Sequence, residues 1–199
     1  MKLYTAKPSQ KKLKYHEEQI HYTLDGTSEY NWRKVQKEIK ELKEIASMPK
    51  KLDFVTDKIE FEELDKFSWL KSDFRLPILN NNFIELLINT YEYEYTKFPI
   101  KIINKKNSEQ VNLNYSGFYV KGYFDCVDRN TSETIKYGEL EYYDYRTAKF
   151  GEDLEYPPLF KIKDISTPFM HFVTDEYKMN FLELNLKGFD MEELNKTRK

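Results

Sequence analysis

The stretch RLPILNNNFIELLINTYEYEYTKFPIKII, residues 75–103, decides the fold class because its character changes twice. An apolar run over 76–79 is followed by three asparagines, after which Phe83 and Leu87 recur at helical spacing. Asparagine before a periodic apolar run is a typical helix N-cap. Residues 98–103 then regain strand character. The stretch therefore predicts a short strand, a short helix and a second strand.

The same order returns near the C-terminus in FMHFVTDEYKMNFLELNLKGFDMEEL, residues 169–194. The matched pairs are Leu79 with Val173, Asn80 with Thr174, Phe83 with Tyr177, Leu87 with Phe181, and Phe98 with Phe189. A strand–helix–strand unit is therefore expected twice in the chain. Because the predicted helices are few and short, the sequence predicts an α+β fold with a mainly antiparallel or mixed sheet.

The N-terminal region has a different pattern. In NWRKVQKEIKELKEIASM, residues 31–48, the apolar residues Trp32, Val35 and Ile39 recur every three or four positions, with Lys and Glu between them. This spacing predicts an amphipathic helix over residues 31–47, with Asn31 as its cap and Pro49 after its end. We expect residues 1–50 to form an N-terminal region packed on a main domain at 51–199.

Composition restricts the classes of protein to which the chain can belong. With 32 basic and 34 acidic side chains the net charge is −2, so no overall positive field points to nucleic acid or an anionic membrane. No apolar run approaches the ~18 residues of a membrane span, and the first residues lack the apolar segment of a secretory signal. We therefore expect a cytoplasmic protein without nucleic-acid or membrane partners. Its oligomeric state stays open.

The segment FDCVDRNTSE, residues 124–133, places the only cysteine among acids and hydroxyls. A nucleophilic cysteine needs a base and a positive environment that lower the thiol pKa, whereas Asp125 and Asp128 act in the opposite direction. In a strand, Phe124, Cys126 and Asp128 would share one face. We interpret the segment as a strand that ends in a polar turn, with Cys126 as a buried structural residue.

A metal-dependent enzyme is the main alternative. Asp125 and Asp128 could hold a divalent cation together with His171, as in a hydrolase, but no calcium-binding loop surrounds them. The sequence HEEQIH puts His16 and His21 five residues apart, which does not place both on one helical face as a zinc protease requires. The chain also lacks the glycine-rich phosphate loops. We expect no catalytic residues, no metal and no cofactor.

Tyrosines and acids alternate between residues 137 and 156, which is the most distinctive local composition in the chain. One interpretation is an ordinary solvated strand. The other is a partner-binding face, because tyrosine supplies rigid contact area and carboxylates select a basic partner. The residues predicted to contact that partner are Glu139, Glu141, Tyr142, Tyr143, Asp144 and Tyr145.

Five segments carry a resemblance to a known protein family. They are SDFRLPILN (72–80), DCVDRNTSE (125–133), LFKI (159–162), VTDE (173–176) and LKGFDMEEL (186–194). The chain resembles the immunity proteins of bacterial polymorphic toxin systems, a family formerly described as a bacterial domain of unknown function. The similarity spans about residues 50–194, and 125–133 is its most specific segment. Asn80 to Asn82 depart from the Ser-Glu that the family favours, and residues 1–50 match no family motif.

The resemblance implies a non-enzymatic protein that binds a cognate toxin and blocks its active site or its target-binding surface. A basic toxin such as a nuclease suits the acidic, tyrosine-rich stretch. Two alternatives stay open from the sequence. One is the metal-dependent hydrolase that uses Asp125 and Asp128, and the other is a structural adaptor module whose acidic face is only solvated.

Overall fold

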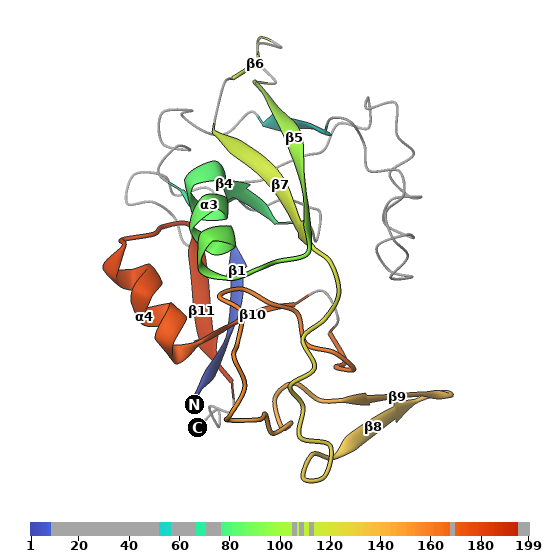
Figure 1. Cartoon of the computed structure of the whole chain (residues 1–199). Helices are drawn as coiled ribbons and strands as arrows, with labels where there is room; N and C mark the ends of the chain where they lie inside the picture. Colours follow the sequence, from blue (N-terminus) through green and yellow to red (C-terminus); the bar gives the residue numbers. More distant parts are fainter. Residues whose placement is uncertain are drawn as a thin grey trace. The chain divides into compact units, whose positions relative to one another are not determined.

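The computed structural model of the chain describes residues 1–8, 52–56, 67–70, 77–104, 107, 110–111, 114–167 and 170–194. These residues form two compact units, coloured along the sequence in Figure 1. Unit 1 contains Met1–Lys7, Gly122–Leu186 and the chain from Asp190, and unit 2 contains Pro8–Lys121 and Lys187–Phe189. The predicted helix over 31–47, His16, His21 and the predicted boundary after residue 50 lie outside the described residues.

Unit 2 is built on a mixed sheet. Its strands are, in order across the sheet, β2 (Leu52–Thr56), β5 (Tyr95–Asn104), β7 (Tyr115–Val120), β4 (Ile78–Asn80) and β3 (Trp69–Leu70), with β6 (Gln110–Val111) paired to β5. β2 runs parallel to β5, and the other neighbours are antiparallel. The sequence prediction of a mainly antiparallel or mixed sheet is therefore confirmed.

Helix α3 (Asn81–Thr90) lies between β4 and β5 along the chain. The Asn80 side chain accepts a hydrogen bond from the backbone N–H of Asn82 at 2.9 Å, which satisfies one of the unpaired donors of the first turn. Phe83, Ile84 and Leu87 lie on its buried face. Burial of such side chains contributes about 1.5–3 kcal/mol each, so packing and the cap together specify this helix. The predicted cap and apolar face are confirmed.

Unit 1 contains a three-stranded sheet in the order β10 (His171–Thr174), β1 (Leu3–Pro8) and β11 (Phe189–Glu193). β1 and β10 are antiparallel, with Leu3 opposite Thr174. Leu194 donates its N–H to the Leu3 carbonyl at 2.9 Å, and the Thr5 hydroxyl donates to the Glu192 carbonyl at 3.4 Å. This register makes β11 antiparallel to β1 as well.

Helix α4 (Asp175–Glu183) follows β10 and precedes β11. The Thr174 side chain accepts a hydrogen bond from the Tyr177 N–H, and two acids in the first turn complement the positive end of the helix dipole. Phe181 is its buried residue. Within the described part of the chain, no helix has the length and apolar character needed to cross a membrane.

The two units repeat the predicted strand–helix–strand order, as β4–α3–β5 and β10–α4–β11. In both, a third strand separates the two strands that flank the helix: β7 in unit 2 and β1 in unit 1. The matched Leu79 and Val173 are both buried, one residue before the helix cap. The predicted duplication and the α+β fold class are therefore confirmed.

One glycine is required by packing in unit 2. Gly188 has a φ of +89°, and a Cβ placed there would lie 2.5 Å from Phe67 Cδ1 and 2.9 Å from the Trp69 carbonyl oxygen. A side chain would therefore meet both conformational strain and backbone. The adjacent Lys187 carbonyl accepts a 2.7 Å hydrogen bond from the Ser68 N–H.

Candidate functional site

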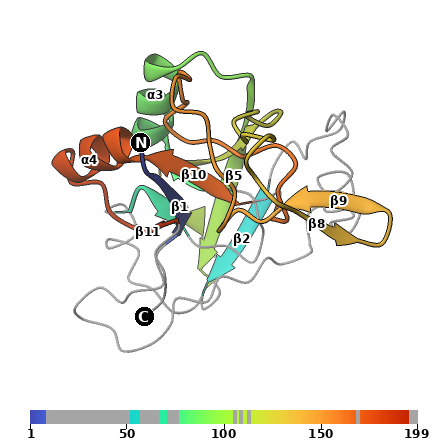
Figure 2. The ribbon, with the colours of Figure 1, turned by 90° about the horizontal axis from the view of Figure 1, so that it is seen from below.

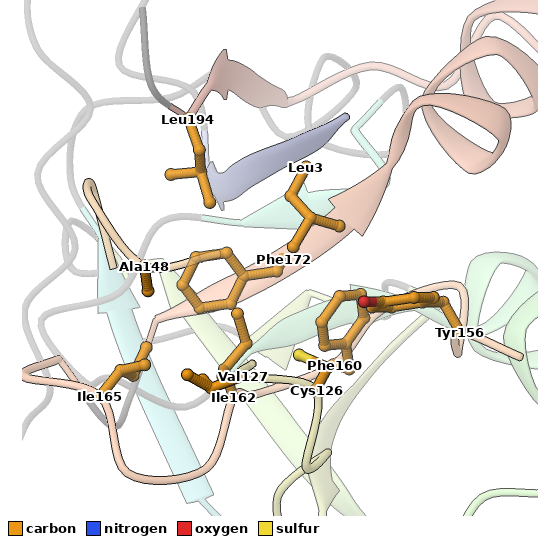
Figure 3. Packing of buried hydrophobic residues seen from close by; sticks show 10 residues of the cluster. All are labelled: Leu3, Cys126, Val127, Ala148, Tyr156, Phe160, Ile162, Ile165, Phe172 and Leu194. Atoms are coloured by element: carbon orange, nitrogen blue, oxygen red, sulfur yellow. The ribbon is translucent and has the colours of Figure 1, made fainter. Parts of the chain in front are cut away.

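The site is supported by an aromatic core in unit 1, shown in Figure 3. Phe160 and Phe172 are almost fully buried, exchange main-chain hydrogen bonds of 3.1 and 2.8 Å, and have ring centroids 6.1 Å apart. The rings of Phe124 and Tyr156 lie 5.5 and 5.4 Å from that of Phe160. The buried cluster comprises Leu3, Cys126, Val127, Ala148, Tyr156, Phe160, Ile162, Ile165, Phe172 and Leu194.

The predicted strand at residues 124–133 is wrong. Only isolated bridges occur there, at Phe124 and Val127, and Cys126 and Val127 are buried side by side, which strand alternation does not allow. The Asp128 carboxylate accepts hydrogen bonds from the Asn130 N–H, at 3.0 Å, and from the Thr131 hydroxyl. These local bonds replace a strand ladder. The predicted polar turn is confirmed.

Cys126 is 2% exposed and belongs to the buried cluster, as predicted. Burial raises the pKa of its thiol to about 12; a hydrogen bond with Tyr156 acts in the opposite direction, and the charge of Asp125 adds to the rise. The thiolate is the reactive form, so the folded environment suppresses reactivity.

We expect Cys126 to react with iodoacetamide at pH 8 at least about tenfold more slowly in the native protein than in urea-unfolded chain, because burial raises the thiol pKa and blocks access. Mass spectrometry of quenched time points measures the two rates. Equal rates would contradict the buried position.

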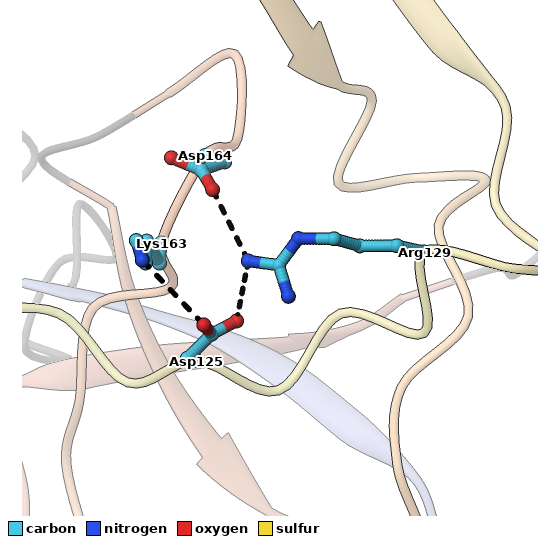
Figure 4. Close-up of polar contacts among 4 residues, drawn as sticks. All are labelled: Asp125, Arg129, Lys163 and Asp164. Atoms are coloured by element: carbon cyan, nitrogen blue, oxygen red, sulfur yellow. Dashed lines mark hydrogen bonds and ion pairs between the residues drawn. The ribbon is translucent and has the colours of Figure 1, made fainter.

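The two aspartates of the hydrolase alternative point to different partners. Arg129 Nη2 lies 2.7 Å from Asp125 Oδ1 and 3.2 Å from Asp164 Oδ2, and Lys163 Nζ lies 3.5 Å from Asp125 Oδ2 (Figure 4). The Asp128 carboxylate accepts hydrogen bonds from residues of its own turn. The hydrogen bond from Thr131 is the main cause of the lowered pKa of Asp128. Among the residues that the structure describes, no three His, Cys, Asp or Glu side chains are grouped to hold a metal ion.

His171 and Lys161 are both buried in unit 1. Burial, and secondarily the charge of Lys161, lowers the pKa of His171 to about 3, so the imidazole is neutral at physiological pH. Burial lowers the pKa of Lys161 to about 8, and its Nζ lies 4.6 Å from the Tyr123 ring centroid. His171 sits beside Phe172 in an apolar stretch, which predicts a packed side chain, and its burial confirms this.

Lys161→Met is expected to change how the free energy of unfolding depends on pH, because burial lowers the pKa of Lys161 to about 8 and methionine does not titrate. Between pH 8 and 10.5 the unfolded wild type binds a proton that the folded form has released, so its stability rises with pH. The variant should lack this rise in urea titrations across that range. A parallel pH profile would contradict the burial of the charge.

Residues 134–143 form an antiparallel hairpin, hereafter the hairpin, made of β8 (Thr134–Tyr137) and β9 (Leu140–Tyr143). Gly138 has a φ of +64° and Glu139 has no positive φ, which is typical of a type II′ turn. Within unit 1 the hairpin extends away from the β10–β1–β11 sheet, as Figures 1 and 2 show.

The sequence predicts further strands over residues 134–150, and this is wrong after Tyr143. After β9 the chain turns, because the Asp144 side chain accepts from the Arg146 N–H at 3.0 Å and the Asp144 carbonyl accepts from the N–H groups of Thr147 and Ala148. Short polar side chains end strands in this way.

The hairpin base is joined to the rest of unit 1 by hydrogen bonds. Asp128 N–H donates to the Lys149 carbonyl at 2.9 Å, and Lys149 N–H donates to the Ser132 hydroxyl at 2.9 Å. These bonds join the chain before β8 to the chain after β9. Tyr143 and Tyr145 pack against the buried cluster, so the base has a fixed position.

The six predicted contact residues therefore divide into two groups. Glu139 and Glu141 are exposed on the hairpin, and Tyr142 is half-buried there. Tyr143 and Tyr145 pack on the core and Asp144 forms the turn, so these three support the base. The first group lies on the hairpin itself, with Glu139 in its turn and with Glu141 and Tyr142 on opposite faces of β9.

Two exposed apolar residues were missed by the sequence prediction. Ile135 is 47% exposed and Leu140 is 57% exposed. Ile135 lies opposite Tyr142, and Leu140 is two residues from Tyr142, so all three lie on one face, hereafter the apolar hairpin face. Alternation around the Gly138 turn is the sequence signal that would have found it.

The opposite face of the hairpin is polar. Lys136 lies opposite Glu141, and the Thr134 hydroxyl donates to Glu141 Oε1 at 2.7 Å. Neither Glu139 nor Glu141 forms an ion pair with any described residue. Exposed apolar area beside unpaired carboxylates is typical of a surface that binds another protein.

Unit 1 also contains a pocket of about 700 Å³. Two of its acids already have counter-charges: Glu152 lies 3.9 Å from the N-terminal amine, and Glu193 lies 2.8 Å from Lys2 Nζ. The hairpin, whose acids have no such counter-charges among the described residues, is therefore the better candidate for binding.

The chain was compared with known protein families and with curated proteins. No protein-family model matches the chain, and a search of curated proteins found no match. The resemblance of residues 125–133 and the other segments to immunity proteins thus stays a prediction from the sequence.

Proposed function

We propose that the protein is a non-enzymatic immunity protein that binds and neutralises a cognate bacterial toxin through the hairpin. The observation that carries the proposal is the exposed apolar hairpin face beside Glu139 and Glu141 on a base packed against the core. An apolar centre with a charged rim is the usual composition of a protein interface. A fixed base reduces the conformational entropy lost on binding.

The charges favour a basic partner. Glu139 and Glu141 are exposed, and they attract a positively charged surface and speed its association. A basic toxin of the nuclease type fits this requirement. The proposal places the protein in the cytoplasm, where it meets the toxin before the toxin acts, and it requires no cofactor.

The proposal is tested by co-expressing the tagged protein with the product of the neighbouring upstream gene. We expect the two proteins to co-purify, and we expect cells that express the neighbour alone to stop growing. Glu139→Lys combined with Glu141→Lys should reduce co-purification, most strongly at low salt. The proposal fails if the neighbour is not toxic or does not bind. Binding without protection would indicate an adaptor instead.

A further inference from the structure

The outer edge of β9 exposes main-chain hydrogen-bonding groups at Glu141. Tyr143 donates its N–H to the Asp164 carbonyl at 2.8 Å and accepts from the Ser166 N–H at 3.0 Å, so both of its main-chain groups point away from β8. In an antiparallel pair this direction alternates along the strand, so the N–H and C=O of Glu141 also point away from β8. No described residue bonds to them.

Among the described residues, a third strand pairs with this edge at one residue only and does not continue along β9. Ile165 forms a parallel bridge with Tyr143, and in a continued parallel ladder residue 163 would lie beside Glu141. Lys163 instead donates its N–H to the Phe124 carbonyl at 3.0 Å. Asp164, with a φ of +58°, turns the chain, and its ion pair with Arg129 stabilises the turned position. The edge is therefore open at Glu141.

We propose that the toxin docks by adding an extended segment to the β9 edge at Glu141, in which apolar and basic side chains alternate. This inference rests on the proposed function. A segment added as a strand forms main-chain hydrogen bonds with β9. Its successive side chains then point alternately to the two faces of the hairpin. Apolar side chains of the segment contact Leu140 and Tyr142, and basic ones contact Glu141 on the other face.

The side-chain charges favour addition of a basic segment to the β9 edge rather than to the β8 edge. On β8 the outward main-chain groups belong to Thr134 and Lys136, because these residues lie opposite Tyr143 and Glu141. The exposed Lys136 repels a basic segment, and lysine on an edge strand is a common protection against unwanted pairing. The same segment therefore meets an attractive charge on one edge and a repulsive one on the other.

The two edges allow a matched pair of variants, Glu141→Pro and Lys136→Pro. Each removes an outward N–H and leaves the main-chain hydrogen bonds inside the hairpin, and proline is tolerated where the N–H of an edge strand faces solvent. Glu141→Pro also removes the hydrogen bond from the Thr134 hydroxyl, and Glu141→Ala is the control for that loss. With the purified product of the upstream gene as the probe, we expect Glu141→Pro to raise the dissociation constant at least about tenfold and Lys136→Pro to change it less than about twofold. Glu141→Gln measures the loss of charge alone and should cost less than Glu141→Pro.

Several outcomes would overturn this inference. Wild-type affinity for Glu141→Pro, or equal losses for both proline variants, would overturn strand addition while the proposed function stands. No binding by the wild type would overturn the proposed function and this inference together. A free protein that is dimeric and becomes monomeric on Glu141→Pro would show that a second copy fills the edge.

A variant-free measurement covers the case in which a proline variant does not fold. Amide exchange by NMR on the wild type should show the Glu141 N–H exchanging fast in the free protein and slowly in the complex, with the Lys136 N–H fast in both. A Glu141 amide that stays fast in the complex would overturn strand addition.

Discussion

Phe160→Ala is expected to lower the free energy of unfolding of unit 1 by about 3–5 kcal/mol, the usual range for a buried phenylalanine. Phe160 is 1% exposed and packs against Phe124, Tyr156 and Phe172. Its removal leaves a cavity among these rings, and the main-chain hydrogen bonds between residues 160 and 172 hold the two segments in place, so the surroundings cannot collapse freely. Urea denaturation followed by far-ultraviolet circular dichroism measures the loss.

Tyr142→Ala is the matched control for this loss. Tyr142 is also aromatic but is only half-buried on the hairpin, so its removal should cost less than about 1 kcal/mol. Similar losses for the two variants would contradict the division of unit 1 into an aromatic core and an exposed hairpin.

Leu140→Asp is expected to weaken binding to the proposed toxin by about 100-fold with little change in stability. Leu140 is 57% exposed in the free protein, so a carboxylate there stays hydrated until the partner covers it. In the proposed complex the same carboxylate would lie within the apolar centre of the interface, where an unpaired charge is costly. Isothermal titration with the upstream gene product measures the affinity.

Leu184→Asp is the control for this variant. Leu184 is 55% exposed at the end of α4, so it matches Leu140 in residue type and exposure but lies outside the hairpin. The dissociation constant of the Leu184→Asp variant for the upstream gene product should stay within about threefold of the wild-type value. An equal loss for the two variants would show that the apolar hairpin face has no special role.

The locally encoded elements were predictable from the sequence. Asn80 and Thr174 identified the starts of α3 and α4, because a cap and the apolar residues of the next two turns lie close together in the chain. For residues 124–133 the sequence predicts a strand that ends in a polar turn; the turn at Asp128 is local and is confirmed, whereas Phe124 and Val127 form only isolated bridges. The position of β1 was not predictable, because Leu3 pairs with Thr174 across almost the whole chain.

The sequence predicted a candidate binding stretch but not how its side chains divide between core and surface. Alternating tyrosines and acids indicate residues 139–145 as a partner-binding face, which stays a prediction, and composition could not separate Tyr142 on the hairpin from Tyr143 and Tyr145 on the core. That separation depends on packing against distant residues such as Phe172, whose ring centroid lies 6.3 Å from that of Tyr145. The apolar hairpin face required the pairing register as well, since it joins residues of two strands.

Amide hydrogen exchange by mass spectrometry, with and without the upstream gene product, tests most directly whether the hairpin contacts the toxin. We predict that peptides covering residues 134–143 exchange more slowly in the complex, while peptides covering α4 exchange as in the free protein. A complex that forms without slowing exchange in residues 134–143, and that protects another segment instead, would contradict the account.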